Sequence, residues 1–312
     1  MKKILTLITF ILFGSFVFYA TVIKNLYRQQ IRIDASTSKI LNRITAVNNI
    51  SRWYMPFASA DTDAIKQPAK EKITYKTTSL EVVKLIGSEA WYRVKEDDRL
   101  DDLVFGILAD GSGSSIVTLS YESTIWNNLF GSNAIIENAK KSLLGLKDYL
   151  GDIKRLYGYP IEMTTVVDTT FLFTSMIVAN RLKKETIQHS YESLIEYARE
   201  KNGGYNGTRI YYELPVGSDS IHLFMSIGIL HPELTPNTTS FSLKRMPYMR
   251  KLVRADYEGR FDKINMLFSA LEQYKTDNKL SSMAIPFLKF DSSLTSFNDA
   301  QIIKAKGFYP VY

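Results

Sequence analysis

The sequence of 312 residues contains no cysteine. Without a thiol, the chain has no disulfide framework, no thiolate metal ligand and no cysteine nucleophile. Histidine is scarce too: His189, His222 and His231 are the only three, and no HExxH motif joins them. The sequence has no GxSxG elbow, and the turn around Gly111 and Gly113 lacks the GKS ending of a phosphate loop. We therefore predict no metal and no cofactor, and we name no catalytic residue.

Long runs of one charge are also missing. The chain has 39 Lys and Arg against 32 Asp and Glu, a net charge of +7, and the two signs alternate along the sequence. Nucleic-acid binding calls for basic residues gathered on one face, so we interpret this balance as a solvated surface and expect no nucleic-acid partner. With 45% hydrophobic residues, the chain can build two ordinary domains, each with its own core.

Charge is absent from one stretch near the N-terminus, residues 4–23, which lies between Lys2 and Lys24. A helix of about 20 residues covers the ~30 Å hydrocarbon core of a bilayer. We predict a transmembrane anchor over residues 1–27, with the bilayer as a partner, in a single-pass membrane protein whose soluble domains lie on the non-cytoplasmic side. The alternative is a signal peptide cleaved after residues 18–20, which the length of the apolar run makes less favourable.

Residues 28–155 predict an antiparallel sheet gripped by a long final helix. The stretch 34–37 is a good helix cap, and apolar residues from Ile135 to Leu150 recur with helical spacing. Between these two helices lie β-like runs divided by turn signals, at residues 73–77, 80–86, 91–94, 103–108 and 115–125.

Residues 156–312 contain the same unit twice. Amphipathic helices are predicted over residues 187–202 and 261–278, and sliding one onto the other matches Leu194 with Leu271. A strand is predicted ahead of each helix, and apolar runs follow each helix. The order is strand, helix, strand, strand, twice, so the predicted fold class is α+β throughout.

The first region resembles a known superfamily. Residues 32–37 ahead of a helix, Asn48 with Trp53 and Pro56, and a closing helix over residues 138–150 look like the START and polyketide-cyclase-like (SRPBCC) superfamily. That resemblance implies a helix-grip fold with a cavity for a small apolar molecule between the curved sheet and the long helix.

The second region resembles the gyrase-inhibitor-like (GyrI-like) effector-binding domains, on residues 257–261 leading into the second helix and on the closing residues 308–311. The resemblance implies a ligand cleft between the two halves, often for aromatic cations. An anchor followed by these two domains is similar to proteins of Bacteroidetes-type bacteria.

Five aromatic residues are candidates for lining these pockets. Trp53 and Trp91 offer large surfaces for the first pocket, and Tyr211, Tyr212 and Tyr257 offer ring faces for the second. The alternative is that such residues simply fill the cores.

One position departs from the GyrI-like pattern. Many of these domains carry a glutamate on the strand after the second helix, where it meets a cationic ligand or, in some members, acts in hydrolysis, but this chain has Lys289 there. A lysine would repel a cation. Glu213 holds roughly the equivalent place in the first half and either substitutes as a ligand group or faces water, and we favour water.

The leading hypothesis is a membrane-anchored binding protein for a small lipophilic or amphipathic molecule. The alternative is a hydrolase or cyclase acting in one of the pockets, which needs a carboxylate such as Glu213, Asp168 or Glu258 aimed into a cavity. A transcriptional regulator is the third hypothesis, and it is weaker because no helix-turn-helix candidate precedes the second region.

Overall fold

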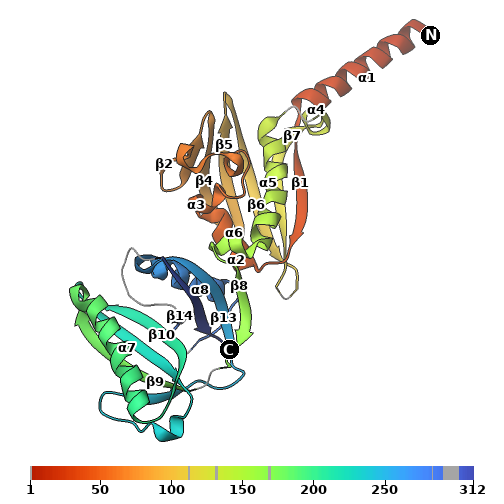
Figure 1. The fold of residues 1–312 in the computed structure, drawn as a ribbon. Coiled ribbons are helices and arrows are strands. Elements are labelled where there is room, and N and C mark those ends of the chain that lie inside the picture. The colour runs from red at the N-terminus through yellow and green to blue at the C-terminus, as the bar shows by residue number, and fades with distance from the viewer. Residues whose placement is uncertain (1, 112, 131–132, 168–169, 283, 291–301) are drawn as a thin grey trace. The chain divides into compact units, whose positions relative to one another are not determined.

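The computed structural model describes residues 2–111, 113–130, 133–167, 170–282, 284–290 and 302–312 (Figure 1). The chain divides into two compact units, Met1–Asp152 and Ile153–Tyr312, called unit 1 and unit 2 below. Each unit holds one large antiparallel sheet with helices packed on it, so the predicted α+β class is confirmed.

Unit 1 is built on a seven-stranded sheet in the order β1-β7-β6-β5-β4-β3-β2. Helices α2 (Thr37–Thr45) and α5 (Ala134–Gly151) pack on it. Helix α2 begins where the cap was predicted, because the Ser36 hydroxyl accepts a hydrogen bond of 3.3 Å from the Lys39 amide. The strands are β1 (Lys24–Ile33), β2 (Lys66–Ala69), β3 (Lys72–Tyr75), β4 (Thr78–Ile86), β5 (Glu89–Glu96), β6 (Arg99–Ala109) and β7 (Ser115–Thr124); the short helices are α3 (Val47–Ile50) and α4 (Ile125–Phe130).

The core of unit 1 lies between the sheet and α5. Buried and partly exposed residues alternate along β7, as expected for a strand with one face on a core. The long helix turns a continuous apolar stripe to the sheet, made of Ile135, Ile136, Ala139, Leu143, Leu146, Tyr149 and Leu150. The predicted helix-grip arrangement is therefore present.

Helix α1 (Lys2–Val22) covers the segment for which a membrane span was predicted. Across the described part of the chain, no helix is both long enough and apolar enough to cross a membrane. The predictions of a transmembrane helix over residues 4–23 and of a single-pass membrane protein are therefore wrong, and nothing supports the predicted bilayer partner. Near the end of α1, the Thr21 hydroxyl donates a 2.7 Å hydrogen bond to the Val17 carbonyl.

Unit 2 is built on an eight-stranded sheet in the order β12-β9-β11-β10-β14-β15-β13-β8. Strand β9 (Thr170–Ala179), helix α7 (Lys183–Glu200) and strands β10 (Tyr205–Val216) and β11 (Ser220–Ile229) form one half. Strand β13 (Lys251–Arg260), helix α8 (Ile264–Asp277) and strands β14 (Phe287–Phe290) and β15 (Ile302–Pro310) form the other. The predicted repeat is confirmed, and β8 (Ile161–Thr165), β12 (Ser242–Arg245) and α6 (Ile153–Tyr157) are additions to it.

Both long helices of unit 2 cover the same face of the sheet. Tyr211, Leu288 and Gly307 are directly paired across β10, β14 and β15, so they share one face. A Cβ atom on Gly307 would come within 2.4 Å of Leu267 on α8, which places α8 against that face. Arg209, two residues before Tyr211, lies 5.5 Å from the ring centre of Tyr191 on α7. The opposite side of the sheet is called the groove face below.

Candidate functional site

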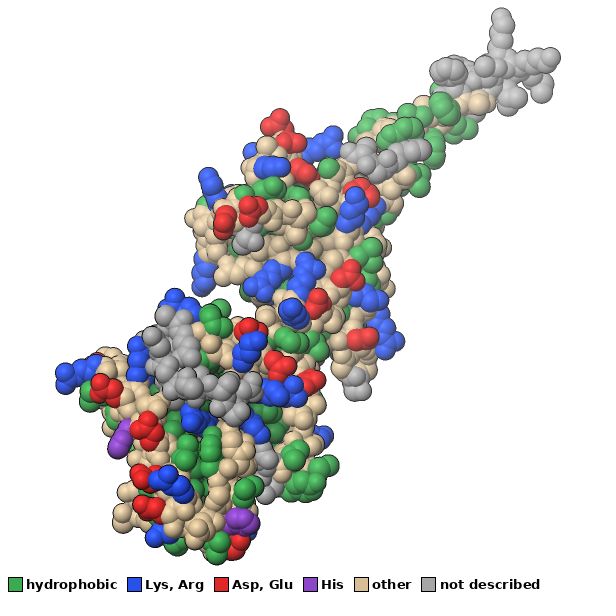
Figure 2. Space-filling view, in the orientation of Figure 1, with side chains coloured by type: hydrophobic (Ala, Val, Ile, Leu, Met, Phe, Trp, Pro, Cys, Tyr) green, Lys and Arg blue, Asp and Glu red, His purple; other side chains and the backbone are tan. Residues whose placement is uncertain are grey.

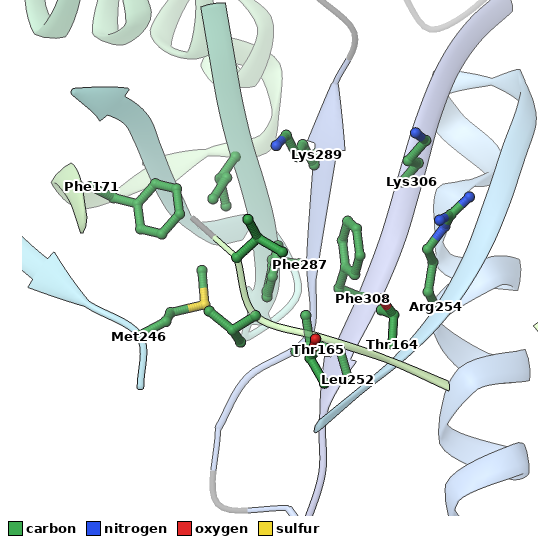
Figure 3. A pocket seen from close by; sticks show the side chains of 13 residues that line it. Thr164, Thr165, Phe171, Met246, Leu252, Arg254, Phe287, Lys289, Lys306 and Phe308 are labelled. Atoms are coloured by element: carbon green, nitrogen blue, oxygen red, sulfur yellow. The ribbon is translucent and has the colours of Figure 1, made fainter. Parts of the chain in front are cut away.

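A groove on the groove face of unit 2 is the candidate site. It consists of two adjoining pockets of about 210 and 430 Å³, which share Val166, Ile210, Met246 and Phe287 as lining residues. The smaller pocket, shown in Figure 3, reaches over β14, β15 and β13, and the larger one extends towards β9 and β11. The groove therefore crosses from one half of the unit to the other.

Most of the groove wall is apolar. Under the smaller pocket, the rings of Phe287 and Phe308 stack with their centres 5.2 Å apart. In the larger pocket, the rings of Tyr212 and Phe224 lie 5.9 Å apart, and Phe173 is 6.4 Å from Phe224. The cluster at the junction of the two pockets consists of Val166, Phe171, Ile210, Leu252, Phe287 and Phe308, with Met246 packed against it.

Six basic side chains complete the wall. The smaller pocket is lined by Arg254, Lys289 and Lys306, and the larger one by Lys244, Arg245 and Arg250. In Figure 3 the nitrogen-bearing ends of the first three lie at one end of the pocket, and Met246 and Leu252 lie at the other. Within the described residues lining the groove, none is Asp or Glu. The groove thus combines apolar surface with positive charge.

This distribution differs from that of the remaining surface. Figure 2 shows Lys and Arg interspersed with Asp and Glu over the face in view, as the sequence predicted for a solvated surface. Among the described residues of the groove lining, by contrast, every charged side chain is basic.

Two of the predicted ligand-binding residues reach the groove. Lys289 lines the smaller pocket and Tyr212 lines the larger one. Burial, with a smaller contribution from the neighbouring Tyr309 phenol, raises the pKa of Tyr212 above its ordinary value. A tyrosine is already protonated at neutral pH, so this shift leaves the Tyr212 phenol neutral there.

Tyr211 and Glu213 lie on the helix-covered face instead. Tyr211 is fully buried, and its hydroxyl donates a hydrogen bond to the Glu213 carboxylate, which also forms an ion pair with Lys183 at the start of α7. The rings of Phe261 and Phe290 flank Tyr211 at 5.6 and 6.0 Å. The expectation that Glu213 faces water is wrong, because residues two apart on a strand share a face and Tyr211 is in the core.

Tyr257 also lies away from the groove. It is 5% exposed, and its hydroxyl donates a 2.6 Å hydrogen bond to the carbonyl of Arg260. Of the other carboxylates considered for catalysis, Glu258 is exposed and pairs with Lys304 at 3.4 Å, whereas Asp168 lies outside the described residues.

The two tryptophans predicted to share a pocket in unit 1 are on opposite faces of its sheet. Trp53 is 1% exposed and packs edge to face on Phe105, 5.6 Å away. Tyr54 and Tyr92 are buried beside it, each 1% exposed. Trp91, next to Tyr92 on β5, points to the other side, where Lys84 sits 4.0 Å from its ring centre.

Five basic residues of the groove were not predicted from the sequence. Four of them flank the groove from neighbouring strands and loops, and the fifth is Lys306. The strand pairing places Lys306 directly opposite Lys289. Such pairing depends on the register of two strands, and only the strand character of each segment can be read from the sequence. The missed groove residues are Lys244, Arg245, Arg250, Arg254 and Lys306.

No known protein family matches the sequence, and no curated protein does. Solved structures similar to this chain include the C-terminal domain of EcmrR, at 14% identity and a TM-score of 0.35, covering 49% of this chain and 98% of that one. A START superfamily protein from Mycobacterium smegmatis has 12% identity and a TM-score of 0.29, covering 40% and 98% of the two chains. The Aha1 dimer from Colwellia psychrerythraea has 18% identity and a TM-score of 0.30, covering 40% and 96%. These values are too low to transfer any activity, so function is inferred from the groove.

Proposed function

We propose that this chain binds a small lipophilic or amphipathic molecule in the groove of unit 2. The observation that carries the proposal is the pair of adjoining pockets, about 210 and 430 Å³, with a mainly aromatic and aliphatic wall. Pockets of a few hundred Å³ lined by apolar side chains and a few polar groups are typical of small-molecule sites. The domain boundaries, residues 28–155 and 156–312, stay predictions. So do the assignments of these domains to the SRPBCC and GyrI-like groups.

The wall explains why an apolar ligand would bind there. Each Å² of apolar surface removed from water contributes about 25 cal/mol, and the stacked rings of Phe287 and Phe308 offer a flat contact surface. Met246 lines both pockets, and its flexible side chain can adjust to ligands of different shape.

Binding is favoured over hydrolysis by the position of the carboxylates. Glu213, the acid nearest in sequence to the groove-lining Tyr212, lies on the helix-covered face with Lys183 and Tyr211 as partners. A general acid or base has to be within hydrogen-bond reach of the reacting group. The described wall offers amines and guanidinium groups, which attract and orient a ligand.

The experiment is a titration of the full chain with 1-aminoanthracene, an uncharged probe whose fluorescence rises in apolar sites. Met246→Trp places a large ring where the two pockets meet, and we expect it to weaken probe binding at least fivefold. The matched control is Met266→Trp on α8, which is 62% exposed and does not line the groove, and it should leave binding unchanged. Equal binding by both variants would show that the probe site is elsewhere and would reject the groove as the binding site.

A further inference from the structure

Two lysines face each other directly across the centre of the groove face. Lys289 on β14 is the register partner of Lys306 on β15, and both line the smaller pocket. Directly opposed residues in an antiparallel pair have Cβ atoms about 4.5–5.5 Å apart, and like charges in such a pair repel. An anion bound at this position would lie within the positive field of both ammonium groups.

A third basic side chain lines the same pocket, and two acids lie beside it. Arg254 lines the same pocket, and its guanidinium is bound by Glu162 at 3.2 Å and by Asp256 at 3.1 Å. Asp256 is also the register partner of Lys306 on its other side, but its side chain is 62% exposed and does not line the pocket. These two acids therefore flank the cationic end of the pocket from outside.

Apolar surface adjoins this cationic end. Phe308 lies two residues after Lys306 on β15, and Phe287 lies two residues before Lys289 on β14. Because residues two apart on a strand share a face, both rings lie on the groove face with the lysines. Figure 3 shows the lysine side chains at one end of the pocket, with Met246 and Leu252 at the other. A ligand that matches both ends has a charged head and an apolar body.

We propose that the groove selects amphipathic carboxylates: the carboxylate sits between the ammonium groups of Lys289 and Lys306, and the apolar body lies along Phe287 and Phe308. The proposal rests on the proposed function and specifies its ligand class. It is the opposite of the cation preference that the GyrI-like resemblance implies. The carboxylate accepts a hydrogen bond from each of the two ammonium groups. Such charge-assisted hydrogen bonds are stronger than hydrogen bonds between neutral groups.

The test compares two probes with the same polyene chain, cis-parinaric acid and the corresponding alcohol, titrated by fluorescence into the full chain at pH 8. We expect the acid to bind at least tenfold more tightly than the alcohol, a difference of about 1.4 kcal/mol. In the double variant Lys289→Gln, Lys306→Gln, this ratio should fall to about one, while the affinity for the alcohol stays within twofold. Raising the salt concentration should reduce the ratio for the parent protein, because salt screens exposed charges.

The matched control is Lys304→Gln, on the same strand and the same face as Lys306, paired with Glu258 and outside the groove lining. It should keep the acid-to-alcohol ratio of the parent protein. Equal affinities of the parent protein for acid and alcohol, or an unchanged ratio in the double variant, would overturn the carboxylate proposal and leave the groove as an apolar binding site. If neither probe binds, the proposed function itself fails.

Discussion

Removing the positive charge of Lys183 is expected to destabilise unit 2 strongly. The Lys183 ammonium pairs with Glu213 beneath α7, where the two side chains are only 17% and 5% exposed. The substitution Lys183→Met keeps the aliphatic length and removes the charge. It leaves the Glu213 carboxylate in the core with the Tyr211 hydroxyl as a neutral donor.

The size of the effect follows from burial. Breaking a buried ion pair by removing one partner costs about 3–5 kcal/mol, since a buried charge loses its compensation. The hydrogen bond from Tyr211 remains, so we expect a loss of about 3 kcal/mol in the free energy of unfolding. Lys304→Met is the matched comparison: its pair with Glu258 has side chains 68% and 65% exposed, and surface pairs contribute about 0–1 kcal/mol.

The assay is urea unfolding followed by two signals. Trp53, Trp91 and Trp126 are the only tryptophans and all lie in unit 1, so tryptophan fluorescence follows that unit, whereas circular dichroism follows both. With a slope of about 1–3 kcal/mol per molar urea, a loss of 3 kcal/mol moves the transition of unit 2 down by roughly 1–3 M. The fluorescence transition should not move.

The double variant Lys183→Met, Glu213→Gln separates charge from packing. It removes both charges, and we expect most of the lost stability to return, because a neutral amide is far less costly to bury than an unpaired carboxylate. A loss below about 1 kcal/mol for Lys183→Met alone, or no recovery in the double variant, would refute the assignment of Lys183 as the counter-charge of Glu213.

Two further substitutions test the packing of each unit. Gly145→Ala should destabilise unit 1 by about 1–2 kcal/mol, because the new Cβ would stand 2.8 Å from the Trp53 carbonyl oxygen. The tryptophan fluorescence transition measures this loss. The control is Gly151→Ala at the end of the same helix, where the new Cβ meets no atom within 4 Å and should not destabilise the unit. Tyr157→Phe should lower the stability of unit 2 by about 1–3 kcal/mol in the circular dichroism transition, since it removes the 2.9 Å hydrogen bond to the buried Asp277 carboxylate, and an unchanged midpoint would mean that water replaces the hydroxyl.

Periodicity along the sequence predicted much of the fold because it is a local signal. The apolar spacing of the helices and the alternation along β11 reflect which side of each element meets a core, and that side is a property of neighbouring residues. The duplicated order of strand, helix, strand and strand followed from it. The exception is the membrane span predicted over residues 4–23, because no helix among the described residues is long and apolar enough to cross a membrane.

The positions of the site residues depend mostly on contacts between segments that are far apart in the sequence. Glu213 could have been placed correctly, because a core residue at Tyr211 fixes the face of its neighbour two positions away. Trp53 and Trp91 could not, since they belong to segments whose faces are set only when the chain packs. The carboxylate-binding pair needed the register of β14 on β15, which joins residues 17 positions apart in the sequence, Lys289 and Lys306.

The shortness of β14 has a consequence for the range of ligands that the groove can accept. Over the described residues, Arg209 to Tyr211 are the positions of β10 that pair with β14, whereas Arg209 to Val216 pair continuously with β11. Among the described residues, the two halves of the sheet are thus joined at few backbone positions, one of which is Ile210 of the groove lining. We expect a small change in the angle between the halves to strain few of these main-chain hydrogen bonds, so that the groove would widen or narrow around ligands of different thickness while Lys289 and Lys306 stay paired.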